Sequence, residues 1–360
     1  MRKVIPLFII IMNVLSVSTF AISAKSAVLI DSASGRVLFE KNKDERLPMA
    51  STTKIMTGLL ACESKKLSET VTVSPVAEGT EGSSIWLKAG EKLTLEELCY
   101  GLMLKSGNDA AVAIAQYLCG SEDAFALVMN KRARAAGANN TCFKNPNGLD
   151  AEGHFTTAYD LAMISKSAMQ NAAFRKIAGT KNKTIPWEDS EWDRALKNHN
   201  KLLWLYEGCN GIKTGFTKKS GRCLVSSAAR DNTELIAVTL NAPDDWNDHK
   251  AMLDEGFKNY STRIIYIKGE KVTKYVYDKK RSKRVLLVSE NGFSIAVKSG
   301  ETISEKIEYL PKKPPLKKGE TGAIVHIYVN GNEICTTPLV YKSNIVTKDK
   351  KKGLIKKLFG

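Results

Sequence analysis

Three short polar motifs stand far apart along the chain, in a fixed order. They are Ser51-Thr52-Thr53-Lys54, Ser106-Gly107-Asn108 and Lys213-Thr214-Gly215. One of them alone would be weak evidence, because S-x-x-K occurs by chance in many chains of this length. Their order and separations argue against coincidence, and the combination S-x-x-K, S-x-N and K-T-G is typical of attack on an acyl carbon.

The first motif supplies a hydroxyl and an amine on one helical face. Ser51 is the predicted nucleophile, and a serine hydroxyl needs a base within hydrogen-bond reach. Lys54 follows three residues later in a segment with helical spacing, so the two side chains share a face. To act as the base Lys54 must be neutral, and burial together with the charge of Lys213 would lower its pKa. The first turn of this helix also offers unpaired N–H groups to an oxyanion.

The second motif is expected between two helices, predicted over 93–104 and 109–118. Ser106 is the candidate for passing a proton from one of the lysines to the leaving amine. Asn108 can both donate to and accept from a peptide backbone. A purely structural alternative is that Asn108 caps the helix that follows, and the sequence allows both roles.

The third motif falls in a predicted strand, where Gly215 permits close approach of another backbone. An extended peptide is expected to pair with this edge. Lys213 and Thr214 would bind its terminal carboxylate by charge-assisted hydrogen bonds, and the backbone N–H of Phe216 is the candidate second oxyanion donor. Taken alone, Lys213 would be an ordinary exposed strand lysine, and only the other two motifs favour the functional interpretation.

The order of the predicted elements favours an α+β fold, with helices packed on an antiparallel sheet. A hairpin over 27–39 precedes a run of helices, and strands between residues 211 and 240 precede a closing helix. From residue 264 onward short strands predict a small all-β domain, a sandwich or barrel-like unit. The expected divisions are a signal peptide (1–23), a catalytic domain (24–261), a small β-sandwich domain (262–346) and a basic amphipathic tail (347–360).

The N-terminal residues have the pattern of a secretory signal. A charged start precedes an apolar run to about Val17, and small residues follow at Ala21 and Ala24. The run is short for a membrane span and Asn13 interrupts it, although an uncleaved anchor stays an alternative. We therefore expect an extracytoplasmic protein, peripheral on the outer face of the cytoplasmic membrane.

Positive charge is concentrated in the last part of the chain. The formal net charge is +16, and residues 262–360 contain 22 Lys plus Arg against 9 Asp plus Glu. Such a surface suits anionic wall polymers or lipid headgroups, whereas no nucleic-acid module is present and no nucleic-acid partner is expected. In a helix, the lysines of 348–360 would surround one apolar face, which predicts a membrane-surface segment. A frayed, solvated tail is the alternative.

Cysteine and histidine patterns give no sign of a metal or cofactor, and none is expected. The seven cysteines are odd in number and scattered, so they are predicted to be mostly reduced and buried. Cys209 and Cys223 are the nearest candidates for a disulfide. The four histidines lack metal-ligand spacing, and no glycine-rich phosphate loop occurs.

The chain resembles the serine D-alanyl-D-alanine carboxypeptidases, the low-molecular-mass penicillin-binding proteins. The resemblance covers most of the chain and rests on Met49-Ala50-Ser51-Thr52-Thr53-Lys54, Lys105-Ser106-Gly107-Asn108-Asp109-Ala110, Asn145-Pro146-Asn147-Gly148-Leu149 and Gly211-Ile212-Lys213-Thr214-Gly215-Phe216-Thr217. It implies removal of the terminal D-alanine from peptidoglycan pentapeptide stems, acylation by β-lactams and a C-terminal segment that holds the enzyme at the membrane. The sequence is also similar to the Gram-positive, spore-forming branch, so vegetative and spore walls are both candidate targets.

Two departures from the family pattern affect the predicted site. Some members have a histidine where this chain has Phe216, but only the backbone of this residue is expected to act. Some members hold the carboxylate with an arginine before the last catalytic-domain helix, and residues 241–250 contain none. We therefore expect Lys213, Thr214 or Arg222 to bind the carboxylate of the substrate in this chain.

Three other functions share parts of this pattern. A β-lactamase would need a group that speeds deacylation, such as the glutamate of class A enzymes, and no E-x-x-L-N stretch lies between Asn108 and Lys213. A transpeptidase would use the same acyl-enzyme. A non-catalytic penicillin sensor or wall-binding protein should lack at least one of the polar motif residues, and all are present.

Overall fold

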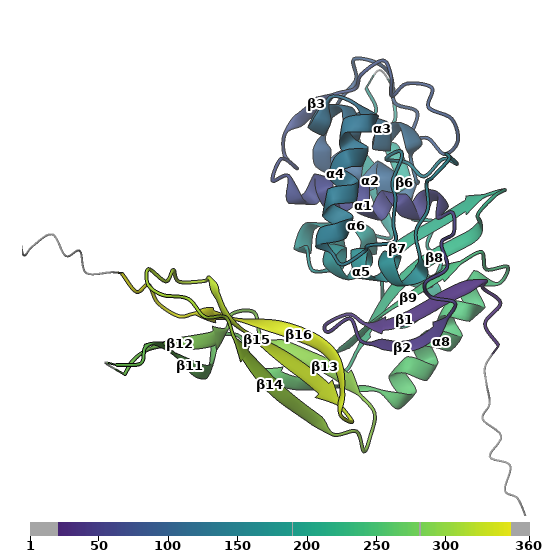
Figure 1. Ribbon diagram of the computed structural model, residues 1–360. Helices are drawn as coiled ribbons and strands as arrows, with labels where there is room; N and C mark the ends of the chain where they lie inside the picture. The colour runs from purple at the N-terminus through teal and green to yellow at the C-terminus, as the bar shows by residue number, and fades with distance from the viewer. Residues whose placement is uncertain (1–20, 189, 281, 347–360) are drawn as a thin grey trace, which may run out of the picture.

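The structure is a computed structural model that describes residues 21–188, 190–280 and 282–346. Its first part is built on a five-stranded antiparallel sheet in the order β2-β1-β9-β8-β7. This order places the N-terminal hairpin beside strands that follow some 200 residues later, and it leaves β7 at an edge (Figure 1). The strands are β1 (Ser26–Asp31), β2 (Val37–Lys41), β7 (Cys209–Thr217), β8 (Gly221–Arg230) and β9 (Thr233–Leu240).

Helices cover both faces of this sheet, so its central strands are apolar on both sides. Val28 and Ile30 of β1 pack into the larger helical core, whereas Ala27 and Leu29 face the single helix α8, as the alternation of strand side chains requires. The helices are α1 (Lys54–Glu63), α2 (Leu95–Leu104), α3 (Asn108–Cys119), α4 (Glu122–Ala135), α5 (Ala158–Met169), α6 (Ala172–Gly179), α7 (Leu202–Leu205) and α8 (Asp245–Asn259).

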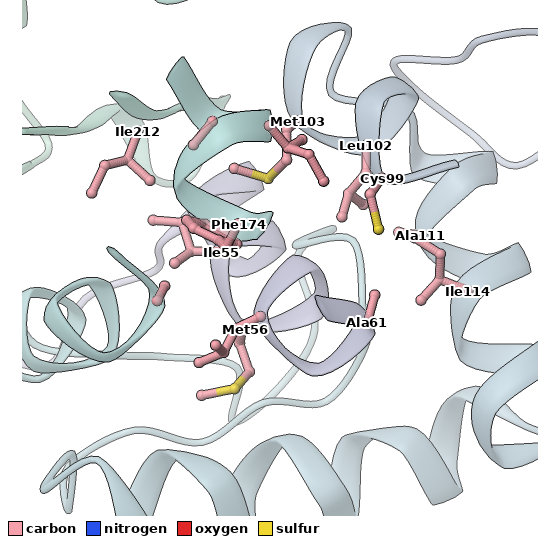
Figure 2. Packing of buried hydrophobic residues seen from close by; sticks show 14 of the residues in the cluster. Ile55, Met56, Ala61, Cys99, Leu102, Met103, Ala111, Ile114, Phe174 and Ile212 are labelled. Carbon is pink, nitrogen blue, oxygen red and sulfur yellow. The ribbon is translucent and has the colours of Figure 1, made fainter. Parts of the chain in front are cut away.

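Helix α1 runs through the middle of the larger core. Ile55 and Met56 of α1 lie among side chains of neighbouring helices, including Leu102, Met103 and Phe174 (Figure 2). These residues are almost completely buried. Packing on all sides therefore fixes the start of α1, which carries the first motif.

Local sequence signals account well for α2. Thr94 accepts a hydrogen bond from the backbone N–H of Glu97 (3.2 Å), and the Glu97 carboxylate accepts one from the N–H of Thr94 (2.7 Å). This is the capping box that the spacing of Thr94 and Glu97 in the sequence predicts. The predicted start at Leu93 is wrong, because Lys92–Thr94 form β4 and pair with β3 (Thr70–Thr72). A second short hairpin, β5 (Asn182–Ile185) and β6 (Arg194–Lys197), was not predicted.

The last part of the described chain is all β, which confirms the predicted fold class. A five-stranded antiparallel sheet in the order β11-β12-β16-β15-β14 packs with a two-stranded sheet, β10-β13, around a separate apolar core. The sequence predicts strands over 264–267, 273–276, 285–287, 293–297 and 324–329, and this prediction missed β14 and β16. The strands are β10 (Ser261–Tyr266), β11 (Glu270–Asp278), β12 (Lys283–Ser289), β13 (Phe293–Val297), β14 (Ile303–Tyr309), β15 (Thr321–Val329) and β16 (Asn332–Tyr341).

The predicted disulfide candidate is wrong, since Cys209 and Cys223 are both free, as are the other cysteines. In the β7–β8 ladder Cys209 lies opposite Ala228 and Cys223 lies opposite Gly215. The two thiols are thus about five residues apart along β8, or about 17 Å at the usual rise of a strand, too far for a bridge.

No single helix among the described residues has both the length and the hydropathy of a membrane span. The pair α3 and α4 passes on length and composition only when taken together, and the two helices meet at 85°.

A partly buried ion pair joins the two parts of the molecule. Arg36, just before β2, donates from both terminal nitrogens to the Glu301 carboxylate at 2.7 Å, and also to the carbonyl of Ala296 at 2.8 Å. The Asp31 carboxylate accepts from the N–H of Ala296 on β13. The bidentate hydrogen bonds from Arg36 hold the pKa of Glu301 below its usual range. This junction fixes the β-domain beside the first hairpin.

We expect Arg36→Ala to loosen this junction, since it leaves a shielded carboxylate and a carbonyl without their donor. The loss should be about 1–3 kcal/mol of unfolding free energy, measured by denaturant titration. The conservative variant Arg36→Lys keeps one donor and should lose less. Equal stability of Arg36→Ala and the wild type would contradict the role assigned to the pair.

Candidate active site

The first motif begins in a short 3-10 turn, η1 (Ala50–Thr53), that runs directly into α1. Ala50 has a left-handed backbone with φ +47, a conformation that costs a non-glycine residue free energy. The neighbouring loop packs tightly here, because a Cβ at Gly148 would lie 2.0 Å from the carbonyl oxygen of Ala50. The turn is therefore held in one conformation, and it places Ser51 on the wall of a cleft.

Lys54 is the centre of the site. Its Nζ lies 2.9 Å from Ser51 Oγ, 2.6 Å from Asn108 Oδ1 and 2.5 Å from the carbonyl oxygen of Asn147, and the side chain is completely buried. A neutral amine has two hydrogens and one lone pair. The two carbonyl oxygens can take both hydrogens, which leaves the lone pair directed at the Ser51 hydroxyl. This is the arrangement that a general base requires.

Burial and a neighbouring charge favour the neutral form of Lys54. Burial is the main cause that lowers its pKa well below the ordinary value, the charge of Lys213 lowers it further, and Asp109 acts in the opposite direction. The predicted mechanism for activating the base is therefore present in the geometry.

Asn108 does not act as a helix cap. The N-cap position of α3 is Gly107, and Asn108 is the first helical residue. Its Oδ1 faces Lys54, and its Nδ2 donates to the carbonyl of Glu81 at 2.6 Å. The side chain is thereby fixed between the loop that holds Glu81 and the base, and the capping alternative is wrong.

Ser106 lies between Lys105, the C-cap of α2, and Gly107, the N-cap of α3. Its backbone is left-handed (φ +62) and the residue is 5% exposed, yet it lines the same cleft as Ser51. The sharp turn between the two helices thus brings a hydroxyl to the cleft, which is consistent with the predicted proton transfer.

The third motif forms the other wall of the cleft, on the edge strand β7. Lys213 is 1% exposed, its Nζ donates to the carbonyl of Thr214 at 3.0 Å, and burial lowers its pKa to about 7. A Cβ on Gly215 would lie 3.0 Å from the backbone nitrogen of Ser51, so a side chain there would push β7 away from the nucleophile. The Phe216 side chain is 65% exposed.

The structure brings all nine predicted site residues to one cleft of about 900 Å³. Lys54, Asn108 and Lys213 are buried beneath it, and the other six line it: Ser51, Ser106, Thr214, Gly215, Phe216 and Arg222. Arg222 differs from the rest, because it lies opposite Phe216 on β8 and its Nε donates to the Asp245 carboxylate at 3.1 Å. Its guanidinium is about half exposed, so part of it still faces the cleft.

Two residues of the site were not predicted to have a role. Asn147 contributes its carbonyl oxygen to Lys54, and Asp109 is a buried carboxylate that accepts from Ser84 Oγ (2.6 Å) and from the backbone N–H of Leu87 (3.1 Å). Asp109 thus fastens the loop before α2 to the start of α3. The signal available in the sequence was that both residues lie in stretches that carry the family resemblance, Asp109 directly after the second motif and Asn147 in Asn145-Pro146-Asn147-Gly148-Leu149.

No group of three or more His, Cys, Asp or Glu side chains suited to a metal ion occurs in the part of the chain that the structure describes. The buried His154 lies 2.8 Å from Thr53 Oγ1, and burial lowers its pKa to about 4. It is a neutral structural residue behind the nucleophile. The fold and the site together define a serine peptidase.

Comparison with known proteins identifies the family. Residues 13–244 match the family model of D-alanyl-D-alanine carboxypeptidases, and residues 260–347 match that of the C-terminal domain of penicillin-binding protein 5. The chain therefore belongs to the D-alanyl-D-alanine carboxypeptidase family, which confirms the resemblance.

The relatives match over about two thirds or more of the chain, two of them over nearly all of it. D-alanyl-D-alanine carboxypeptidase DacF of Bacillus subtilis is 37% identical over 350 residues, which cover 94% of this chain and 89% of that protein. Penicillin-binding protein 5 of Haemophilus influenzae is 28% identical with a TM-score of 0.73, over 92% of this chain and 100% of that one. A serine-to-alanine mutant of Streptomyces K15 DD-transpeptidase is 31% identical with a TM-score of 0.63, over 66% of this chain and 99% of that one.

The pKa of Lys213 predicts how the reaction depends on pH. Lys213 carries its charge below a pH of about 7 and loses it above that. If Lys213 binds the terminal carboxylate of the substrate, kcat/KM should therefore fall on the alkaline side, because that carboxylate loses its cationic partner. Because kcat/KM reports groups of the free enzyme, the midpoint should lie near this value. Lys213→Arg keeps the charge and should move the alkaline limb to higher pH; an unchanged limb would show that Lys213 is not the titrating group.

Proposed function

We propose that this protein removes the C-terminal D-alanine from the pentapeptide stems of peptidoglycan, through an acyl-enzyme on Ser51. The observation that supports this most strongly is the arrangement around Lys54, where two carbonyl oxygens and the Ser51 hydroxyl surround one buried amine. The family to which the chain belongs supplies the substrate class.

Acylation follows from this geometry. Lys54 takes the proton of Ser51, whose oxygen attacks the carbonyl carbon of the penultimate D-alanine. The backbone N–H groups of Ser51 and Phe216 are the proposed oxyanion donors, which typically stabilise such a charge by about 3 kcal/mol each. Ser106 passes the proton to the amine of the leaving D-alanine, and Lys213 with Thr214 holds its carboxylate.

Deacylation uses the same base in the opposite order. With D-alanine gone, a water molecule reaches the ester carbonyl, Lys54 removes its proton, and the Ser51 oxygen leaves with that proton. The free enzyme and the shortened stem result, so the chemistry requires no cofactor.

A β-lactam would acylate Ser51 in the same way, but the resulting ester would be hydrolysed slowly. Among the described residues that line the cleft, the single carboxylate is that of Asp245, and it is bound to Arg222. After ring opening the expelled nitrogen of a β-lactam stays attached to the acyl group, so it does not vacate the place through which water reaches the ester once D-alanine has left. A carboxylate that could activate water along another path, as in class A β-lactamases, is not provided there. We therefore propose that penicillins act as long-lived covalent inhibitors.

Transpeptidation is the second candidate, and the structural likeness to Streptomyces K15 DD-transpeptidase favours considering it. An amine would replace water as the acceptor for the same acyl-enzyme. Product analysis with and without a D-amino acid acceptor distinguishes the two, since hydrolysis gives only the shortened peptide.

Ser51→Ala tests the nucleophile. We expect D-alanine release from a diacylated Lys-D-Ala-D-Ala peptide to fall about 10³-fold or more, with loss of covalent penicillin labelling seen by intact mass. Ser83→Ala is the matched control, because Ser83 lines the same cleft but has no proposed role, and it should keep both. Full labelling of Ser51→Ala would refute the assignment.

For the location, we propose that the protein is secreted and held on the outer face of the cytoplasmic membrane by its basic C-terminal segment. That segment, like residues 1–20, lies outside the described residues, and the proposal is supported by its sequence pattern. Residues 348–360 hold six lysines around Leu354, Ile355, Leu358 and Phe359, and such a pattern binds anionic membrane surfaces.

Deleting residues 348–360 should release the protein from membranes while D-alanine release from a soluble peptide stays within about twofold of wild type, because the site lies in another domain. Membrane flotation of the full-length and shortened chains measures this. Unchanged membrane retention of the shortened chain would mean that the tail is not the anchor.

A further inference from the structure

The β-domain carries an uneven distribution of charge. Three separate segments that carry exposed basic residues come together at the end of this domain formed by β11 and β12, which lies far from the catalytic domain (Figure 1). We call this the distal basic surface, and its members are all exposed: Arg284, Lys313, Lys317, Lys318 and Lys342.

We propose that the distal basic surface binds the anionic headgroups of membrane phospholipids and is a second, folded part of the membrane attachment. This inference rests on the proposed location outside the cytoplasmic membrane and not on catalytic activity.

Backbone contacts bring the three segments together. The N–H of Lys342, just after β16, donates to the carbonyl of Leu286 on β12 at 2.9 Å, close to Arg284. On the other side, Leu316 and Ile345 exchange two backbone hydrogen bonds of 2.9 Å, and the N–H of Lys318 donates to Asn344 Oδ1 at 2.7 Å. The lysines of 313–318 therefore lie beside the last described residues of the chain.

The charge of this surface is largely uncompensated. None of its five members forms an ion pair with another described residue. The acidic neighbours are Glu320, which pairs with Lys312 and also accepts from the backbone N–H of Lys317, Asp278, which lies opposite Lys283, and Glu290, whose carboxylate would lie 3.9 Å from a Cβ at Gly319. An excess of positive charge remains.

Several acidic groups of the same domain are engaged elsewhere. Glu301 is bound to Arg36 at the junction with the catalytic domain, and Glu305 accepts from Tyr266. Glu308 and Glu333 flank His326. Lysines that served only solubility would not need to be kept apart from the acidic groups of the domain. Binding to a negatively charged surface does need the basic and acidic groups to be separated.

The place where the described chain ends favours lipid headgroups over a soluble polymer as the ligand of the distal basic surface. The described chain ends next to Ile345, which pairs with Leu316 between Lys313 and Lys317, and the sequence that follows would combine lysines with one apolar face in a helix. Apolar side chains gain free energy from acyl chains and not from a polyanion in water. A short amphipathic segment alone gives only marginal attachment to a membrane. The distal basic surface, next to the start of that segment, would add the electrostatic attraction that makes the attachment stable.

The test compares full-length proteins for binding to vesicles of neutral phosphatidylcholine with and without phosphatidylglycerol. The variant Lys313→Gln/Lys317→Gln/Lys318→Gln removes three charges from the surface. The matched control Lys65→Gln/Lys131→Gln/Lys258→Gln removes three exposed lysines of the catalytic domain that form no ion pair among the described residues.

Each lysine near an anionic surface contributes roughly fivefold in affinity, so the surface variant should bind phosphatidylglycerol vesicles at least about tenfold more weakly, and the control should match wild type. Surface-variant binding equal to that of the control would overturn the proposal. So would a loss seen with a soluble polyphosphate but not with vesicles, which would point to wall polymer. D-alanine release by both variants tests the proposed function separately and should not change.

Discussion

The Lys54 amine and the three oxygens around it are the interaction on which the rest of the site depends. A buried lysine is costly to keep charged, and here its two carbonyl partners satisfy a neutral amine and leave a lone pair for Ser51. The three oxygens come from the turn η1 before α1, from the start of α3 and from the loop near residue 147. The base exists only because the fold brings these segments together.

The architecture explains how these distant segments reach one point. The sheet order places the edge strand β7 against η1, and Gly215 lets the two backbones approach until a Cβ would nearly touch the nitrogen of Ser51. Packing around α1 then prevents Ser51 from shifting. Lys213, brought in on β7, contributes the charge that lowers the pKa of Lys54. The same strand thus shapes the cleft and tunes the base.

Much of this was predictable from local sequence. The capping box at Thr94, the α+β order of elements and the motif residues all depend on short-range patterns that the chain states directly. What could not be predicted depends on tertiary contacts. Asn147 acts through a carbonyl that any residue has, Arg36 and Glu301 are far apart in sequence, and the pairing of β3 with β4 shortened a predicted helix. Strand β14 lies at an edge of its sheet and has no buried residue, so its apolar periodicity is weak, and β16 contains Pro338, which argues against an inner strand.

The central claim is that Lys54 is a neutral base in the resting enzyme. The most direct test is to follow the side-chain signals of Lys54 by NMR as pH is varied, with Lys54→Arg used to assign them. We predict that the amine loses its proton well below the ordinary lysine pKa, because burial and the charge of Lys213 disfavour the charged form, and that Lys213→Met raises the pKa of Lys54. A Lys54 that stays protonated up to the ordinary value would contradict the account.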